Sequence, residues 1–485
     1  MVVWLCLLAV VSVVCGASID SGPQMASYDT IVIGMGAAGT TAASMLAKAG
    51  KRVLGLDAQD RIGGRVNTVP FGDGVVELGA EWIHGTRPSP VYDLAIQNNV
   101  SVIEQDISME VFMSDGSLAD KELVNELLNF CLQVVDDPPP TPGPLGQHIT
   151  KKLMDYIKDK HPSLLNDQAF IQEFLSFMDL MVDNYEATDS WNDITTESRY
   201  EELEGHQHVS WHKNGYKTLF EILLNTYKNG PGLPTLTIKL KTEVSQIVWP
   251  QDPEAKVVVK CKDGAEYTAD NVIVTVSVGV LKERHSTLFS PRLPPQKVSL
   301  INSISLGVVD KIILLFPHSW WPKTNTFYAF IWKTEEKEKV QDVWITKIFG
   351  ASSPMGCDKA LTLWTNGEYA KLVETLPEDV VKRKAMELLR RFMGAKVTIP
   401  EPIGMLRSTW YSNPFTRGSY TYDNLSSPSH PTARPDLAAP LTDSSGRARV
   451  LFAGEATHLT HFSTVHGAVE SGKREANRLL PSSKI

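Results

Sequence analysis

The sequence is poor in cysteine and has no excess of basic residues. Five cysteines occur in 485 residues, and only Cys131, Cys261 and Cys357 lie beyond the N-terminal block, an odd number without paired spacing. This pattern excludes a disulfide scaffold, and nothing resembles a zinc site, so we expect no metal. The formal net charge of −9 argues against a nucleic-acid partner and is compatible with a cationic substrate.

The sequence also lacks an apolar run of the roughly 20 residues that a membrane-spanning helix needs. Residues 1–17 are largely apolar, contain no acid or base and close on Gly16 and Ala17. This block is typical of a signal peptide, although no basic residue precedes its apolar core, and a retained anchor is the alternative. We therefore expect a secreted protein with no stable membrane insertion after cleavage. Glycosylation sequons at Asn99 and Asn424 would matter only in that case.

A glycine-rich turn after an apolar segment is the strongest positive signal in the chain. The run 31–33 predicts a buried parallel strand. Gly34, Gly36 and Gly39 follow with G-x-G-x-x-G spacing, and residues 39–49 favour a helix. Gly34 permits a tight turn, Gly36 lets the backbone approach a pyrophosphate, and Gly39 allows close helix–strand packing.

An acidic residue completes this fingerprint. Residues 51–56 predict a second strand that ends at Asp57, 23 residues after Gly34, where a carboxylate can accept a ribose hydroxyl. The N-terminus of the intervening helix offers free N–H groups and a partial positive charge to phosphates. We predict a dinucleotide site; the alternative is a glycine-rich turn without a ligand.

Later motifs carry a resemblance to a known family. RIGGR at 61–65 and VVELGAEWIHG at 75–85 follow the fingerprint, and residues 406–422 and 454–476 add WYSNPFTRGSY and GEATH…STVHGAVESGKREA. Together they resemble the flavin-dependent amine oxidases, and the WIHG form looks most like their polyamine oxidase branch. The resemblance extends over nearly the whole chain beyond the N-terminal block.

The resemblance implies FAD and assigns its contacts along the chain. The implied cofactor-binding residues are Gly34, Gly36, Ala38, Gly39, Asp57, Gly64, Arg65, Gly79, Ala80, Trp82, Val244, Trp410, Glu455, Thr464 and Val465. Monoamine oxidases bond their flavin to a cysteine near the segment that matches residues 406–422. No cysteine follows Cys357 here, so FAD should be held noncovalently.

Two residues are candidates for catalysis. Lys311 interrupts an apolar strand expected over residues 308–316, and a lysine is rarely buried unless it is paired. The pattern alone favours a strand end whose lysine reaches water, whereas the resemblance implies a water-mediated contact near flavin N5 that assists reoxidation. His84 should lie beside the reacting nitrogen, where a neutral imidazole could accept a hydrogen bond from the amine.

Three acidic residues are candidates for binding substrate ammonium groups: Glu81, Glu202 and Glu204. A polyamine needs carboxylates at intervals with aromatic faces between them. A solvated loop around residues 201–204 is equally compatible with the sequence, and Glu81 could instead brace its own loop.

We expect an α/β protein of two lobes with a discontinuous Rossmann-type domain. The FAD-binding domain should comprise residues 25–104, 206–297 and 402–485, and an α+β substrate domain should comprise residues 105–205 and 298–401. Helices are predicted over 121–135, 169–182 and 217–227. The proline-rich stretch 136–146 between them predicts a loop, since proline lacks a backbone donor.

The function implied by the resemblance is oxidation of polyamines (spermine, spermidine or acetylated forms) by O2, giving an aldehyde, a shorter amine and H2O2. A secreted L-amino-acid oxidase is one alternative, and Arg417 would then be the candidate for binding the substrate carboxylate. A catalytically inactive flavoprotein is another. A nuclear demethylase is not expected, because the long inserted helical arm of those relatives is missing.

Overall fold

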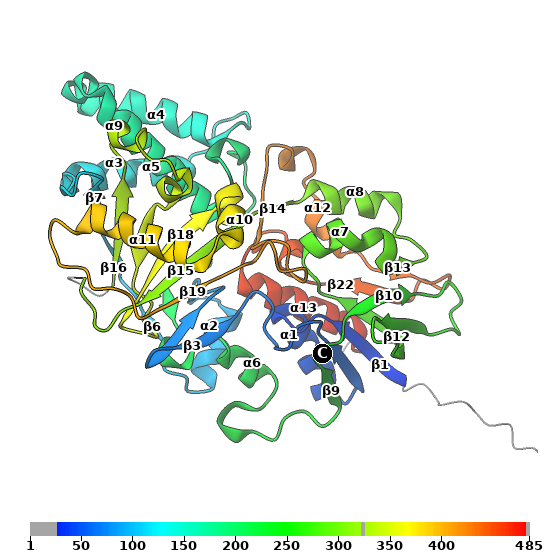
Figure 1. Ribbon diagram of the computed structural model, residues 1–485. Helices are drawn as coiled ribbons and strands as arrows, with labels where there is room; N and C mark the ends of the chain where they lie inside the picture. The colour runs from blue at the N-terminus through cyan, green and yellow to red at the C-terminus, as the bar shows by residue number, and fades with distance from the viewer. Residues whose placement is uncertain (1–26, 322–324, 482–485) are drawn as a thin grey trace, which may run out of the picture.

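The computed structural model describes residues 27–321 and 325–481, and it contains two large sheets with helices packed around them (Figure 1). The architecture is mixed α/β. The signal peptide predicted over residues 1–17 lies outside the described residues. No helix in the described ranges is long and apolar enough to cross a membrane.

The larger sheet has nine strands and contains the glycine fingerprint. β1 (Ser27–Ile33) lies between β2 (Val53–Leu56) and β12 (Glu266–Val274) and is parallel to both. β22 (Ala448–Phe452) is also parallel to β12, so strands from both ends of the chain share this sheet. The other members are β9 (Leu236–Lys239), β10 (Val244–Val248), β11 (Val257–Cys261), β13 (Phe289–Ser290) and β21 (Leu441–Thr442).

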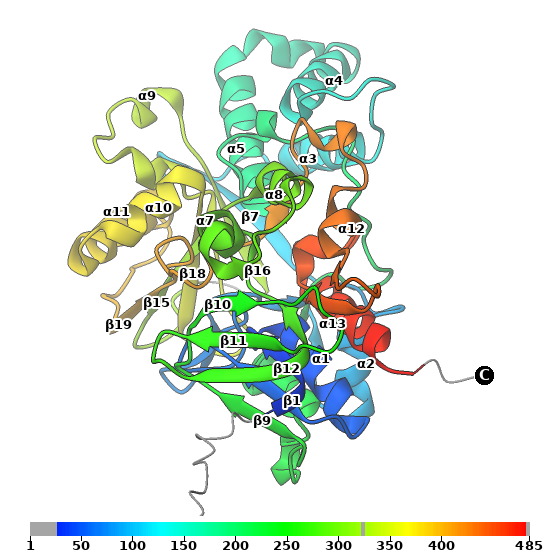
Figure 2. The ribbon, with the colours of Figure 1, turned by 90° about the vertical axis from the view of Figure 1, so that its right-hand side faces the viewer.

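Two helices from opposite ends of the chain pack together against this sheet. α1 (Ala37–Lys48) and α13 (Val465–Leu479) lie side by side in both views (Figures 1 and 2). Their backbones approach closely, since a Cβ atom placed on Gly472 would lie 2.3 Å from the carbonyl oxygen of Ala38. The fingerprint and the C-terminal helix therefore belong to one structural unit.

The second sheet has six strands and positions Lys311. Its order is β19 (Gly404–Arg407), β15 (Val309–Leu315), β18 (Ala360–Asn366), β17 (Gly350–Ser352), β16 (Thr326–Ile331) and β7 (Ser108–Met113). β15 is buried along its whole length, so its apolar run reflects contacts on both faces. β19 joins this sheet although it falls beyond residue 401, where we place the end of the substrate domain.

Helices cover both faces of the six-stranded sheet. On one face lie α3 (Lys121–Val135), α4 (Leu145–Lys160) and α5 (Gln168–Glu186), and on the other lie α10 (Gly367–Thr375) and α11 (Glu378–Met393). The amphipathic segments predicted for α3 and α5 thus become helices that bury their apolar sides against the strands.

Smaller elements complete the fold. The helices are α2 (Pro90–Gln97), α6 (Thr218–Leu223), α7 (Val278–Leu288), α8 (Pro295–Ser303), α9 (Thr334–Lys337) and α12 (Ala433–Ala438). The strands are β3 (Thr68–Phe71), β4 (Gly74–Glu77), β5 (Trp82–Ile83), β6 (Ile103–Glu104), β8 (Val209–Ser210), β14 (Ser305–Leu306) and β20 (Thr421–Tyr422).

The helical region differs from the prediction in two places. α4 was not predicted, because its buried stripe is narrow, with Ile149, Leu153 and Ile157 spaced four residues apart among charged neighbours. α6 is shorter than the helix predicted over residues 217–227, since the chain turns at Asn225, whose φ is 58°.

The two sequons differ in accessibility. The Nδ2 atom of Asn424 donates to Ser303 O at 3.1 Å and to Ser305 Oγ at 2.7 Å. Asn99 is exposed. Of the two side chains, only that of Asn99 presents a free amide at the surface.

Candidate functional site

The presence of glycine at each of the three fingerprint positions has a different structural explanation. Gly34 adopts a φ of +95°, which favours glycine, and a Cβ atom on Gly39 would lie only 1.9 Å from Gly34 O. A Cβ atom on Gly36, by contrast, would meet nothing closer than Gly63 O at 3.8 Å. The protein alone does not require glycine at position 36, so this position fits the close approach of a ligand such as a pyrophosphate.

Asp57 braces the glycine turn. Its carboxylate accepts hydrogen bonds from Met35 N at 2.7 Å and Gln59 N at 2.8 Å. Burial raises the pKa of Asp57, and these two backbone hydrogen bonds oppose the shift. Asp57 O also accepts from Thr242 N, which brings the start of β10 and the buried Val244 to the same end of the sheet.

A partly buried ion pair joins the RIGGR motif at 61–65 to the C-terminal motif at 454–476. Arg65 Nη1 lies 2.9 Å from Glu455 Oε1 and also donates to Ser419 O at 2.8 Å. Burial alone would raise the pKa of Glu455, but the charges of Arg65 and Arg434 and its hydrogen bonds outweigh burial and lower it.

This ion pair lines a pocket at the carboxyl ends of β12 and β22. The lining also includes Val276, Ser277 and Gly454. Ligands of open parallel sheets bind at the carboxyl ends of the strands. The pocket is therefore suited to part of a cofactor that begins at the glycine turn.

The loop between β4 and β5 packs tightly against these groups. Ala80 N donates to Arg65 O at 3.2 Å, and a Cβ atom on Gly79 would lie 1.9 Å from that oxygen. The indole of Trp410 is buried and donates to Leu78 O at 3.2 Å. Gly64, with a φ of +58°, places the preceding turn next to Gly36.

The N-terminus of α13 is capped and points its first turn toward this region. Thr464 is the N-cap, and its hydroxyl accepts from Gly467 N at 3.0 Å and donates to His461 O at 2.7 Å. Val465 is the first helical residue. The uncapped N–H groups of this turn carry the partial positive charge that suits an electron-rich ligand edge.

Lys311 is buried in the middle of β15, with 3% of its surface exposed. Its ammonium donates to Glu77 O at 3.0 Å, Gly79 O at 2.9 Å and Glu81 Oε2 at 2.7 Å. The interpretation as a strand end reaching water is therefore wrong, and the reason is this set of acceptors, which the strand pattern does not reveal.

Aromatic rings continue from Lys311. Its ammonium lies 4.5 Å from the ring centre of Trp364, which stacks on Trp82 with centres 5.9 Å apart. Trp82 in turn meets His208 edge-on at 5.2 Å and donates to Gln105 Oε1 at 2.7 Å. Lys311 thus connects to the tryptophan and histidine cluster around the WIHG motif.

His84 is held in one neutral form. Its Nδ1 atom lies 2.7 Å from Gln207 O, and because a carbonyl only accepts, Nδ1 carries the proton. The Nε2 atom therefore keeps its lone pair. Burial, with a smaller contribution from His208, lowers the pKa of His84 to about 4, so the ring stays neutral at physiological pH.

The three predicted carboxylates lie in different environments. Glu81 is buried against Lys311, with 9% of its side chain exposed. Glu202 and Glu204 are exposed, and Glu204 contacts the WIHG loop through its backbone oxygen, which accepts from Thr86 N and Arg87 N.

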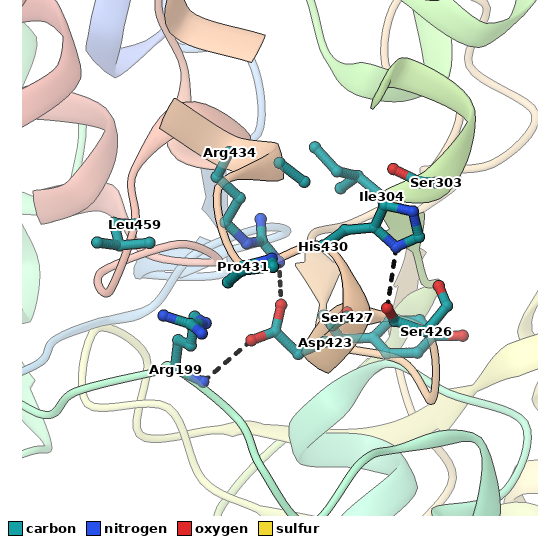
Figure 3. Close-up of a pocket in the computed structure, with 12 residues that line it drawn as sticks. Arg199, Ser303, Ile304, Asp423, Ser426, Ser427, His430, Pro431, Arg434 and Leu459 are labelled. Atoms are coloured by element: carbon teal, nitrogen blue, oxygen red, sulfur yellow. Dashed lines mark hydrogen bonds and ion pairs between the residues drawn. The ribbon is translucent and has the colours of Figure 1, made fainter. Parts of the chain in front are cut away.

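A further carboxyl group, not predicted from the sequence, lies at the end of α5. Glu186 forms no hydrogen bond and no ion pair among the described residues. Burial and, to a smaller extent, the charge of Asp423 raise its pKa to about 7, although the charge of Arg434 acts in the opposite direction. The Arg434–Asp423 pair lies in the pocket of Figure 3 and is separated by 3.1 Å.

Two tyrosines lie near this carboxyl group. Tyr420 OH donates to the carbonyls of Asn184 and Tyr185, at 2.9 and 3.1 Å. Burial raises the pKa of Tyr200 and of Tyr420, and the charge of Glu186 acts on both in the same direction. Glu202 also acts on Tyr200, so the region combines two carboxyl groups with two aromatic rings. Glu186 ends an ordinary amphipathic helix, so no local motif could have identified it.

One histidine cluster has residue types that can bind metal. His458 Nε2 and His461 Nδ1 lie 3.1 and 2.6 Å from Glu470 Oε2. His458 Nδ1 accepts from His461 N at 2.8 Å, so the proton of the neutral ring is on Nε2. A metal at Nε2 would move that proton to Nδ1, against the backbone N–H. The cluster therefore suits a carboxylate bound by two imidazole N–H groups, which outweigh burial and lower the pKa of Glu470 to about 2.

Comparisons with known proteins agree with this geometry. A family model described as flavin containing amine oxidoreductase matches residues 37–480. The peroxisomal N(1)-acetyl-spermine/spermidine oxidase of Bos taurus is 30% identical over 495 residues, which cover 93% of this chain and 94% of the relative. Probable polyamine oxidase 5 of Arabidopsis thaliana is 28% identical over 537 residues, covering 93% and 97%. Polyamine oxidase 1 of Oryza sativa subsp. japonica is 29% identical over 510 residues, covering 93% and 96%. The chain belongs to the flavin-containing amine oxidase family.

Proposed function

We propose that the protein oxidises polyamines such as spermine, spermidine or their acetylated forms, with FAD as cofactor and O2 as electron acceptor. When bound, FAD accepts the electrons and hydrogen removed from a C–N bond. The overall reaction consumes one amine, one O2 and one water, and it yields one aldehyde, one shorter amine and one H2O2.

The residues at the predicted cofactor site support FAD over a mononucleotide. Gly36 leaves room where a pyrophosphate would approach, and Asp57 stands at the ribose end. Arg65 and Glu455 line the pocket farther along, and the first turn of α13 follows. Such a series of polar groups suits a long ligand. No cysteine follows Cys357, which supports noncovalent binding.

The observation that carries the polyamine proposal is the unpaired carboxyl group of Glu186 among tyrosines. A carboxyl group with a pKa near 7 ionises readily when an ammonium group approaches, because the new opposite charge favours the ionised form. Tyr200 and Tyr420, on which the charge of Glu186 acts, offer aromatic rings to the methylene segments and to the cation. We infer that Glu186 binds an ammonium group distant from the bond that reacts.

His84 is suited to the reacting nitrogen. The Nε2 lone pair, set by the Nδ1–H···O contact with Gln207, can accept a hydrogen bond from the amine. The low pKa of His84 keeps a positive charge away from this position, so the ring does not repel a cationic substrate.

The substitution Glu186→Gln tests the polyamine proposal. We expect KM for spermine to rise by about ten- to a hundredfold, the effect of losing one charge-assisted contact, while KM for short monoamines changes by less than threefold. The measurement is steady-state peroxide formation across amines of increasing length. Glu254→Gln is the matched control, because Glu254 is an exposed acid of the loop between β10 and β11.

The same steady-state measurement is repeated at several pH values. Glu186 becomes ionised as pH rises through about 7, so KM of the wild type for spermine should fall between pH 6 and pH 8. Glu186→Gln should lose this component of the pH dependence. Equal KM values for wild type and variant on every amine and at every pH would remove Glu186 from substrate binding.

An L-amino-acid oxidase has less support. Such an enzyme needs a cation for the substrate carboxylate, and Arg417 was the candidate from the sequence. Its guanidinium is already paired with Glu283, through Nε and through Nη2 at 3.3 Å. An inactive flavoprotein has less support too, because Lys311 is buried among defined acceptors and the half-buried His84 is fixed by its contact with Gln207 O.

A further inference from the structure

The hydrogen-bonding capacity of Lys311 is fully used by the protein. An ammonium group has three N–H donors. Lys311 has three oxygen acceptors within 3.0 Å, namely Glu77 O, Gly79 O and Glu81 Oε2, and the Trp364 ring covers it at 4.5 Å. The water-mediated cofactor contact expected from the sequence would need one of these donors.

The three acceptors are not equivalent. Glu77 O is the backbone carbonyl of the last residue of β4, and Gly79 O belongs to the tightly packed loop that follows, so the positions of both are set by the fold. Glu81 Oε2 belongs to a side chain and forms the shortest contact, 2.7 Å. Glu81 is therefore the acceptor that a substitution can replace. It is also the only one of the three acceptors that carries a formal charge.

The pair also changes the local electrostatics. Both side chains are nearly inaccessible to solvent, 4% for Lys311 and 9% for Glu81, so water screens their charges weakly. Together they have no net charge. Without Glu81, Lys311 would keep its positive charge beside the loop that packs on Arg65, and the buried Glu77 carboxyl, whose pKa burial raises to about 7, would offset that charge in part.

We propose that Glu81 is a positioning residue that holds the Lys311 ammonium and cancels its charge, and thereby slows reoxidation of the enzyme by O2. This inference rests on the proposed function. Reoxidation converts one O2 to one H2O2 with two electrons and two protons, and negative charge develops on oxygen as the electrons arrive. A net positive charge nearby stabilises that change, so a neutral Lys311–Glu81 pair stabilises it less.

Glu81→Gln is the direct test. Glutamine keeps an oxygen acceptor for Lys311 at the same length and removes only the negative charge. The bound flavin is reduced with dithionite, so no amine is required, and the enzyme is mixed with O2 at several concentrations in a stopped-flow instrument. We expect the bimolecular rate constant to rise on the order of tenfold over wild type.

The double variant Glu81→Gln/Lys311→Met separates charge from packing. At this position the double variant again has no net charge, so it should reoxidise faster than Lys311→Met, whose Glu81 carboxylate is uncompensated, and more slowly than Glu81→Gln. A readout independent of turnover is the thermal melting of the holoenzymes. Lys311→Met should melt lower than wild type, and the double variant should recover part of the loss, because Glu81 is then no longer an unpaired buried charge.

Glu81→Ala repeats the rate measurement should the glutamine variant fold poorly. Unchanged or slower reoxidation in both Glu81 variants would overturn the proposal. A higher KM for amines with unchanged reoxidation would also overturn it and would assign Glu81 to substrate binding. Because dithionite replaces the amine, these results do not depend on whether any polyamine is a substrate.

Discussion

Gly36→Ala should give a folded protein that has lost its flavin. A Cβ atom at this position meets no protein atom closer than 3.8 Å, and the φ of −75° suits alanine, so the fold should be retained. The methyl group would occupy the space through which a pyrophosphate approaches the backbone. We expect FAD affinity to fall at least a hundredfold, measured as flavin per protein after purification and by titration with FAD.

Gly39→Ala is the matched comparison, because it fails for a different reason. Its Cβ atom would lie 1.9 Å from Gly34 O, so the turn or α1 must move. Overpacking of this kind costs about 1–3 kcal/mol or more, and we expect a lower melting temperature as well as lost flavin. A Gly36→Ala protein that keeps its flavin at wild-type affinity would refute the assigned pyrophosphate position.

Lys311→Met should affect both stability and reoxidation. It removes the ammonium that binds Glu77 O and Gly79 O and leaves the Glu81 carboxylate buried without its partner. Breaking a buried pair in this way costs about 3–5 kcal/mol. We also expect reoxidation by O2 to slow by on the order of a hundredfold, since an uncompensated negative charge opposes charge development on oxygen. FAD should remain bound.

Lys297→Met separates these two effects. Lys297 is also a buried lysine, with 6% of its surface exposed, and its ammonium donates to carbonyls of α12 and the residues after it. Its loss should lower the melting temperature and leave reoxidation unchanged. Equal reoxidation rates for Lys311→Met and wild type in stopped-flow measurements would contradict a role for Lys311 at the cofactor.

The sequence signals for the proposed cofactor end of the site are local. Gly34, Gly36, Gly39 and Asp57 lie within 24 residues of one another, and their spacing follows from the geometry of one strand–turn–helix–strand unit. The match of α3 to residues 121–135 has the same origin, since the amphipathic pattern of a helix is contained within it.

Contacts between residues far apart in the sequence, at the proposed amine-binding end of the site, could not be predicted in this way. Glu81 meets Lys311 across 230 positions, and Tyr420 meets the carbonyl of Tyr185 across 235. Neither pairing has a local pattern, because each depends on how the six-stranded sheet and α5 pack against the loops of the larger sheet. Glu186 was missed for this reason, and the Glu81 contact with Lys311 became visible only in the folded chain.

Anaerobic mixing of the purified holoenzyme with single amines tests the central claim most directly. The visible absorbance of oxidised flavin should bleach with spermine, spermidine or one of their acetylated forms at a rate that saturates with amine concentration. Short monoamines and L-amino acids should leave it unchanged over the same time. Bleaching by L-amino acids and by no polyamine, or no bleaching by any amine with flavin fully bound, would contradict the proposal that this protein oxidises polyamines.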